Sequence, residues 1–252
     1  MISDPTANPI VAAFDAAAET YDAATPVQRE VAQALVARAA ENVGGPPRQI
    51  LDLGAGAGHV TGFAMARWPN AKMTALDAAP AMLRRLRAKF PGVATVTRDA
   101  RQLDRLKGFD LILSSMMLHW LDDPRAALAD WRSRLAPGGL LAVALPVAGS
   151  LGEWRELTRA AGLQDALWNF PPQDFAEGLG GQGLGANIEF REFSETYPDP
   201  HAFLRALKDA GAQRPRPGAL AATAGAMRRL LATRAGPFKA TFRIAFILAR
   251  AV

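Results

Sequence analysis

The sequence predicts one α/β domain with a seven-stranded, mostly parallel sheet that helices cover on both faces. The chain has 252 residues, of which 50% are apolar, and this is enough to bury one large core. From residue 46 onward, short apolar runs alternate with stretches of helical periodicity, a pattern typical of βαβ units. No apolar run approaches the roughly 20 residues that a membrane-spanning helix needs, so we expect no membrane association.

The elements of the first part of the chain follow from apolar spacing and from glycine and proline breaks. Apolar residues recur at near-helical intervals from residue 9 to residue 43, and Gly44-Gly45-Pro46-Pro47 ends this helical region. The alternation that follows predicts strands at 49–54, 72–77, 93–99, 109–118 and 140–147, and helices at 58–68, 79–90 and 124–136.

After Gly149 the regular alternation of strands and helices ends. A helical insert separates the last two predicted strands. The pattern predicts helices at 152–168, 172–179, 200–211 and 218–234, strands at 188–197 and 238–249, and a mobile glycine-rich turn at 178–187. We find no internal repeat, so a single domain explains the whole chain.

Composition excludes several kinds of site. The chain has no cysteine, which removes disulfides, thiolate metal sites and a cysteine nucleophile. Its three histidines, His59, His119 and His201, are widely spaced, so we expect no metal. The first 22 residues carry acids but no basic segment, so we expect no signal peptide and a cytoplasmic location.

Charge is distributed unevenly along the second half of the chain. Residues 151–200 hold three arginines against nine acids, whereas residues 201–252, the cap, hold ten lysines and arginines against Asp209 alone. Such runs are often solvated surface, but a basic cap also suits an acidic protein partner. Nucleic acid is a weaker candidate, because the cap has few aromatic residues and no recognisable binding module.

A glycine-rich loop after the first predicted strand marks a ligand site. Gly54, Gly56 and Gly58 lie between that strand and a helix, where α/β sheets bind their ligands. His59 occupies the position of the last glycine of the Gly-x-Gly-x-x-Gly motif that binds dinucleotides. The sequence therefore favours a ligand without phosphates over a pyrophosphate. Asp77 ends the second strand and can accept both hydroxyls of a ribose, although it can also act as a helix cap.

Three other residues fit the same ligand. Asp99 follows the third strand and is placed to take an adenine amino group, and Met82 can lie against the adenine face. Asp52, at the end of the first strand, could accept a hydrogen bond from an ammonium group of the ligand.

Four ordered motifs in residues 48–145 resemble those of the class I S-adenosylmethionine-dependent methyltransferases. They are ILDLGAGAG, ALDAAPAML, RDARQL and LAPGGLLAV. The resemblance implies a Rossmann-like fold and direct displacement of the methyl group by the acceptor, with no metal and no covalent intermediate. The cofactor residues that it implies are Tyr21, Asp52, Gly54, Ala55, Gly56, Asp77, Ala78, Met82, Asp99, Ala100 and Ser114.

The flanking segments resemble one branch of that superfamily, the malonyl-[acyl-carrier protein] O-methyltransferases of biotin synthesis. The segments are FDAAAETYDAATPVQREVA, AGSLGEW, FPPQDFAEGL, FLRALKDAGA and FKATFRIAFILAR. The resemblance implies N-terminal lid helices in residues 1–45, a cofactor-binding core in 46–150, and cap helices with the last strands in 151–252. It also makes Tyr21 a lid tyrosine over the cofactor, with a core or surface role as the alternative.

Such an enzyme would methylate the free carboxylate of a malonyl thioester on acyl carrier protein. That carboxylate, with a pKa near ~4, is already ionised at neutral pH, so it requires no general base. It requires a cation to orient it, and Arg205 and Lys208 in the cap are the candidates unless they are simply exposed. Carrier proteins are acidic, so the cap is also the expected docking face.

One departure from the family pattern keeps other functions open. The family commonly has Ser-Asn and Gln-Trp after the fourth strand, but this chain reads SSMMLHW, with Ser115 and His119. That variant resembles the respiratory complex I assembly factors that act as arginine hydroxylases. His119 could be a base or could only pack. Besides the carboxyl O-methyltransferase, a hydroxylase-like assembly factor and a methyltransferase of another small acid stay open, with a nicotinamide-dependent oxidoreductase as a distant fourth.

Overall fold

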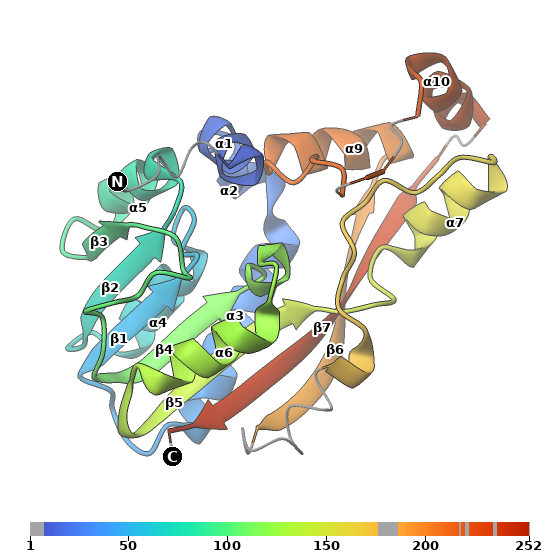
Figure 1. Ribbon diagram of the computed structural model, residues 1–252. Coiled ribbons are helices and arrows are strands. Elements are labelled where there is room, and N and C mark those ends of the chain that lie inside the picture. Colours follow the sequence, from blue (N-terminus) through green and yellow to red (C-terminus); the bar gives the residue numbers. More distant parts are fainter. Residues whose placement is uncertain (1–7, 176–185, 217, 220–221, 234–235, 252) are drawn as a thin grey trace.

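The computed structural model describes residues 8–175, 186–216, 218–219, 222–233 and 236–251. In this part of the chain a seven-stranded sheet has the order β3-β2-β1-β4-β5-β7-β6 (Figure 1). The first five strands pair in parallel, and β7 pairs antiparallel with β5 and with β6. The strands are β1 (Gln49–Leu53), β2 (Lys72–Asp77), β3 (Ala94–Thr97), β4 (Phe109–Ser115), β5 (Leu135–Pro146), β6 (Asn187–Tyr197) and β7 (Phe238–Arg250). The Rossmann-like, mostly parallel fold predicted from the sequence is confirmed.

Alternate residues of the central strands pack into two separate layers. Ile50 and Leu111 belong to the core on one face of the sheet, while Leu51 and Ile112, one residue further along, belong to the core on the other face. This follows from the two-residue period of a strand, and it explains why these strands read as continuous apolar runs.

Different helices cover the two faces. Buried residues of α3 (Pro26–Asn42), α4 (His59–Arg67) and α5 (Pro80–Lys89) join the first core, as do Trp154, Phe203 and Leu230 from helices of the second half of the chain. Helix α6 (Pro124–Ser133) joins the second core. Trp131 of α6 is fully buried, and its indole donates a hydrogen bond to the Ala100 carbonyl at 2.9 Å. No helix of the described residues is both long and apolar enough to cross a membrane.

The helical region predicted at 9–43 consists of three helices. They are α1 (Pro9–Ala16), α2 (Tyr21–Ala24) and α3. Asn8 caps α1 by accepting a hydrogen bond from the Ile10 backbone, and Pro26 begins α3, where its missing N–H costs no helical bond. Apolar spacing alone did not reveal these breaks, because the buried residues keep a helical spacing across them.

Several boundaries in the second half also differ from the prediction. Helix α7 (Gly152–Ala160) ends well before residue 168, and α9 (Pro200–Asp209) and α10 (Ala224–Thr233) are shorter than predicted. Strand β5 begins at Leu135, before the Pro137-Gly138-Gly139 segment, where the pairing with β4 shifts register. Residues 173–175 are helical, but residues 176–179 of the helix predicted at 172–179 and residues 178–185 of the turn predicted at 178–187 lie outside the described residues.

The carboxyl ends of the parallel strands meet at one edge of the sheet, which is where ligands bind in such folds. Helices α1 and α2 lie above this edge, between α5 and α9 (Figure 1). We call α1 and α2, residues 9–24, the lid.

Candidate functional site

The glycine loop is fastened to the end of β2 by its own backbone. The N–H groups of Gly54 and Ala55 both donate to the carbonyl of Leu76, at 2.9 and 3.0 Å. Gly54, Gly56 and Gly58 have φ values of 69°, 52° and 96°, in the left-handed region that favours glycine. At Gly54 a Cβ atom would also overlap the side chain of Met117. The sequence thus places glycine where both backbone conformation and close packing require it.

Asp77 joins the glycine loop to the start of α5. Its Oδ2 accepts a hydrogen bond from the Gly56 N–H and its Oδ1 accepts one from the Ala79 N–H, each at 2.8 Å. Burial raises the pKa of this carboxyl, and the backbone hydrogen bonds oppose that rise. Asp77 therefore holds the turn that precedes α5, whose N-cap residue is Ala79, and it also faces the cavity described next.

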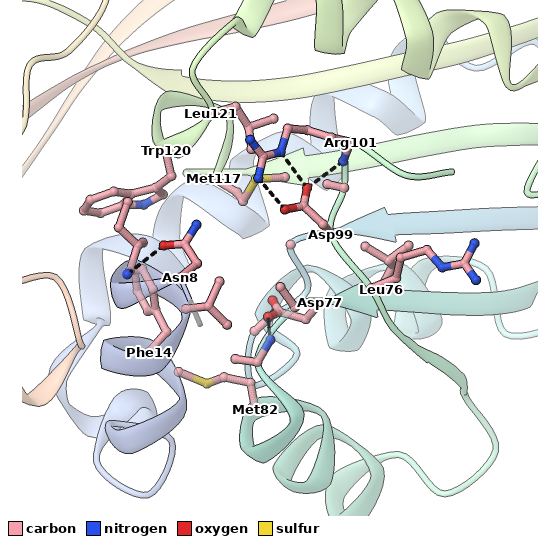
Figure 2. A pocket seen from close by; sticks show the side chains of 18 of the residues that line it. Asn8, Phe14, Leu76, Asp77, Met82, Asp99, Arg101, Met117, Trp120 and Leu121 are labelled. Carbon is pink, nitrogen blue, oxygen red and sulfur yellow. Dashed lines mark hydrogen bonds and ion pairs between the residues drawn. The ribbon is translucent and has the colours of Figure 1, made fainter. Parts of the chain in front are cut away.

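A cavity lies between the glycine loop, the ends of β2 and β4, and the lid (Figure 2). This first cavity encloses about 930 Å³ of empty space, part of it open to solvent. Of the cofactor residues predicted from the sequence, the following line it: Tyr21, Gly54, Gly56, Asp77, Ala78, Met82, Asp99 and Ala100. A polar ligand here would meet the backbone of the glycine loop and carboxylates on one side and apolar residues of the lid on the other.

Three predicted cofactor residues lie behind this wall. Ala55 is buried in the core. Asp52 accepts a hydrogen bond from the Thr61 hydroxyl at 2.7 Å, and burial raises its pKa to about 7 despite that bond. The Ser114 hydroxyl donates to the Leu53 carbonyl at 2.9 Å, within the sheet. The structure therefore brings none of these side chains to the cavity wall.

The neighbour of Ser114 faces the cavity instead. Ser115 lines it, and the Ser115 hydroxyl has no hydrogen-bond partner among the described residues. Successive side chains of a strand point to opposite faces, so Ser114 and Ser115 point in opposite directions and only one of them faces the cavity. The prediction chose the wrong member of the Ser-Ser pair, and only the register of β4 distinguishes them.

Arg101 is a site residue that the sequence reasoning missed. Its guanidinium donates to both oxygens of Asp99, at 3.0 and 2.7 Å, and also forms an ion pair with Asp122 at 3.1 Å (Figure 2). Burial alone would raise the pKa of Asp99, but the hydrogen bonds from Arg101 hold it below its ordinary value. The carboxylate that was expected to take an adenine amino group is thus already engaged, and Arg101 itself lines the cavity.

A second, more apolar cavity adjoins the first. It encloses about 610 Å³ of empty space, part of it open to solvent, and shares Phe14, Tyr21, Met116 and Trp120 with the first cavity. Met116 has a φ of 53°, in the left-handed region that non-glycine residues rarely adopt. Such strain gathers at functional sites, and here it falls on the partition between the two cavities. The other lining residues are Gln28, His119, Leu151, Leu167, Trp168, Phe170, Leu207, Ala210, Ala212 and Phe242.

His119 lies in the wall of this second cavity. Its ring contacts those of Trp120 and Phe170, with centroids 4.8 and 5.4 Å apart, and its backbone carbonyl accepts a hydrogen bond from the Trp168 indole at 2.8 Å. Its Nδ1 is buried and has no partner among the described residues. Burial lowers the pKa of His119 to about 3, so the imidazole is neutral at physiological pH.

Tyr21 stands at the junction of the two cavities. It lines both of them, and its hydroxyl lies over Gly56. Its ring stacks on that of His59, with centroids 5.8 Å apart, and His59 is in turn 2.9 Å from the Thr25 hydroxyl. Burial and the neighbouring carboxylates raise the pKa of Tyr21, so the phenol stays protonated at neutral pH.

The two cations predicted to orient a substrate carboxylate lie elsewhere. Arg205 and Lys208 are exposed on α9, and neither lines the first or the second cavity. Arg205 instead lies 3.2 Å from the Nδ1 of His201, one turn earlier on the helix. Neighbouring Leu207 faces the second cavity, so the helix turns its charged residues outward and its apolar face inward.

The lid is attached to both sides of the site. Asp15 accepts a hydrogen bond from the Ala81 N–H on α5 at 2.6 Å, and Asp22 pairs with Arg85 and Lys89 of the same helix at 3.3 and 2.9 Å. On the other side, the Thr20 hydroxyl donates to the Asp209 carbonyl at the end of α9 at 2.7 Å. The lid therefore bridges α5 and the end of α9.

In the part of the chain that the structure describes, no three His, Cys, Asp or Glu residues gather as a metal site would require. The arrangement consists of a polar cavity and an apolar cavity that share four residues. It is suited to holding two molecules side by side and excluding water between them, which is what a direct transfer between them requires.

Comparisons with known proteins agree with this geometry. A family model described as a methyltransferase domain matches residues 50–139. The malonyl-[acyl-carrier protein] O-methyltransferase of Methylococcus capsulatus is 35% identical over 206 residues, which are 79% of this chain and 74% of that protein. The biotin biosynthesis bifunctional protein BioCD of Bordetella avium is 36% identical over 208 residues, 81% of this chain and 44% of that protein. Among solved structures, the plantazolicin methyltransferase BpumL in complex with SAH shares the fold, with a TM-score of 0.54, 13% identity, and coverage of 99% of this chain and 92% of that chain.

Proposed function

The chain belongs to the malonyl-[acyl-carrier protein] O-methyltransferase family, and from this membership we propose that it methylates the free carboxylate of a malonyl thioester on acyl carrier protein. S-adenosylmethionine is the methyl donor in this proposal, and the step belongs to biotin synthesis, as the name of the BioCD relative suggests.

The extent of the similarity carries the proposal. The matched methyltransferase domain ends at residue 139, but the similarity to the Methylococcus capsulatus enzyme extends over 206 residues. Regions outside the cofactor domain therefore take part, and these regions supply most of the wall of the second cavity.

The first cavity supports S-adenosylmethionine as its ligand. Asp77 lies at the end of β2, where a carboxylate can accept hydrogen bonds from ribose hydroxyls, and Met82 offers an apolar surface to a base. The glycine loop brings bare backbone close to a polar ligand. Tyr21 covers the loop from the lid side, so that the reacting methyl group would lie near the junction of the cavities.

The cap supports a carrier protein as the partner. Arg205 and Lys208 on α9, with Arg228 and Arg229 on α10, are exposed cations. Since they do not line the cavities, we assign them to docking of the acidic carrier and withdraw the prediction that they orient the carboxylate.

The first test is a mass spectrum of malonyl-acyl carrier protein after incubation with the protein and S-adenosylmethionine. The expected product is heavier by one methyl group in place of a proton, with the ester at the malonyl end. Malonyl-coenzyme A and succinyl-acyl carrier protein, run in parallel, measure how much the carrier and the acyl chain each contribute.

Two results would contradict the proposal in different ways. If S-adenosylmethionine binds and another small acid is methylated, the acceptor assignment is wrong but the chemistry stands. If the cofactor binds and no carboxylate is methylated, the hydroxylase-like assembly factor becomes the better explanation.

A further inference from the structure

The second cavity has no charged side chain among its described lining residues. Apart from the indole N–H groups of its tryptophans, its polar side-chain groups are the Tyr21 phenol, the Gln28 amide and the His119 imidazole. The rest of the wall is aliphatic or aromatic. An acceptor that carries a carboxylate must therefore bury this charge without the help of a protein cation.

His119 is a polar group in this wall with unused hydrogen-bonding capacity. The residue is 7% exposed, and its Nδ1 has no partner among the described residues. A buried polar atom without a partner is destabilising, so proteins rarely keep one unless a ligand or a water satisfies it. Because the ring is neutral, one of its two nitrogens carries a proton, so the imidazole offers a hydrogen bond but no charge.

We propose that the acceptor carboxylate binds in the second cavity to neutral donors, His119 and Gln28, and that its counter-ion is the sulfonium of the cofactor. This inference rests on the proposed function and adds the residues that recognise the acceptor.

The chemistry of the transfer explains why a cavity without a cation serves the reaction. A carboxylate oxygen forms a bond to the methyl carbon while the carbon–sulfur bond breaks and its electron pair goes to sulfur. An anion and a cation become a neutral ester and a neutral thioether, and no proton moves. The charges attract more strongly where the dielectric constant is low, so an apolar wall draws the two reactants together.

A lysine or arginine in this wall would oppose the reaction. It would stabilise the full negative charge of the bound carboxylate more than the partial charge left in the transition state, and interactions that favour the ground state raise the barrier. It would also repel the sulfonium. A neutral donor orients the carboxylate at a smaller cost to its reactivity.

Steady-state kinetics of His119→Leu and His119→Gln on malonyl-acyl carrier protein test the role of the imidazole. We expect Leu to raise the KM for the acceptor about tenfold or more, with a smaller fall in kcat, because a hydrogen bond to a charged group is lost. Gln restores a neutral donor and should bring KM back to within about threefold of the wild type. Affinity for S-adenosylhomocysteine, measured by calorimetry, should change less than twofold in both variants.

Gln28 provides variants that do not disturb the core. Gln28 is half-buried on α3, so Gln28→Leu should fold normally and raise KM a few-fold, whereas Gln33→Leu, on the exposed side of the same helix, should leave it unchanged. Gln28→Lys places an ammonium in the wall, and we expect it to lower both KM and kcat.

The outcomes separate the two proposals. A wild-type protein that binds the cofactor but does not methylate malonyl-acyl carrier protein contradicts the proposed function, and the inference falls with it. A wild-type protein that is active, with His119→Leu unchanged in KM, overturns the inference alone. Equal losses in His119→Leu and His119→Gln would overturn it as well, because ring packing and not hydrogen bonding would then be responsible. A rise in kcat for Gln28→Lys would show that the site tolerates a cation and would overturn the charge argument.

Discussion

Single residues at the end of β2 show how one side chain can both build the site and serve its ligand. Asp77 holds the glycine loop and the start of α5 through two backbone hydrogen bonds, and it also lines the first cavity. A carboxylate oxygen can accept more than one hydrogen bond, so these contacts leave room for ribose hydroxyls.

Replacing Asp77 by Ala should weaken S-adenosylmethionine binding at least tenfold, because charge-assisted hydrogen bonds to the ribose are lost. Asp77→Asn keeps one oxygen acceptor without the charge, so its affinity for S-adenosylmethionine should lie between those of Asp77→Ala and the wild type. Isothermal calorimetry measures both, with thermal unfolding as the check on the fold. Unchanged affinity in Asp77→Ala would place the cofactor somewhere else.

His59 gives the protein a predictable loss of stability in acid. Burial lowers its pKa from 6.5 to about 4, against the smaller opposing effect of Asp22. At pH values above 6.5 the residue is neutral in both the folded and the unfolded chain. As the pH falls from 6.5 to about 4, the unfolded chain binds a proton that the folded chain does not, so the free energy of unfolding decreases.

His59→Gln should therefore flatten the pH dependence of the free energy of unfolding between pH 6.5 and about 4, where His59 contributes at most about 1.4 kcal/mol per pH unit. Urea unfolding at several pH values measures the slope. His201→Gln, which removes an exposed histidine on α9, is the matched control. The same slope in His59→Gln and the wild type would show that His59 is not responsible.

At the scale of elements, the lid is held to α5 by charged groups at the protein surface. Asp22 is the centre of this contact, with Arg85 and Lys89 as its partners. Exposed ion pairs of this kind contribute roughly 0.2–1 kcal/mol each and are screened by salt. The attachment of the lid to α5 should therefore weaken as the ionic strength rises.

Asp22→Asn should weaken S-adenosylhomocysteine binding by up to about fivefold and reduce the salt dependence of that binding. Calorimetry at low and high ionic strength measures the affinity for S-adenosylhomocysteine and its salt dependence. Glu30→Gln on the exposed face of α3 is the control. Faster hydrogen exchange in residues 9–24 of the variant would support the same explanation. A salt dependence equal to that of the wild type would contradict it.

The elements also show what the sequence could predict and what it could not. The strand ending at Asp77 and the turn at Gly54 were predictable, because period, burial and glycine geometry all act locally. The choice between Ser114 and Ser115 depends on the register of β4 against its neighbours. Arg101 depends on a side-chain conformation, although its position two residues after Asp99 was a signal. The second cavity joins segments from five separate parts of the chain, so no local pattern describes it.

At the scale of the whole molecule, charge separates the proposed docking surface from the proposed site of methyl transfer. Exposed cations gather on α9 and α10, while the lining of the second cavity, as far as the structure describes it, is uncharged. Long-range attraction can then guide an acidic carrier without placing a cation beside the reacting carboxylate.

Replacing Arg228 and Arg229 together by Glu should raise the KM for malonyl-acyl carrier protein several-fold and lower its sensitivity to salt, since both charges favour encounter with an acidic partner. The KM for S-adenosylmethionine should not change. Activity on malonyl-coenzyme A serves as the internal control, because it does not require the carrier surface. A proportional loss with both acceptors would contradict a docking role.

The position of β7 has a consequence for how the chain acquires its structure. This strand follows β6 in sequence but lies between β5 and β6 in the sheet. Until β7 is in place, β5 and β6 each have an unpaired edge, and such edges are the sites at which partly folded chains associate. The last strand along the chain therefore completes the sheet from within, through contacts with residues more than ninety positions earlier, so we expect slow folding. Loss of residues 238–250 would leave two open edges, and the truncated protein should aggregate.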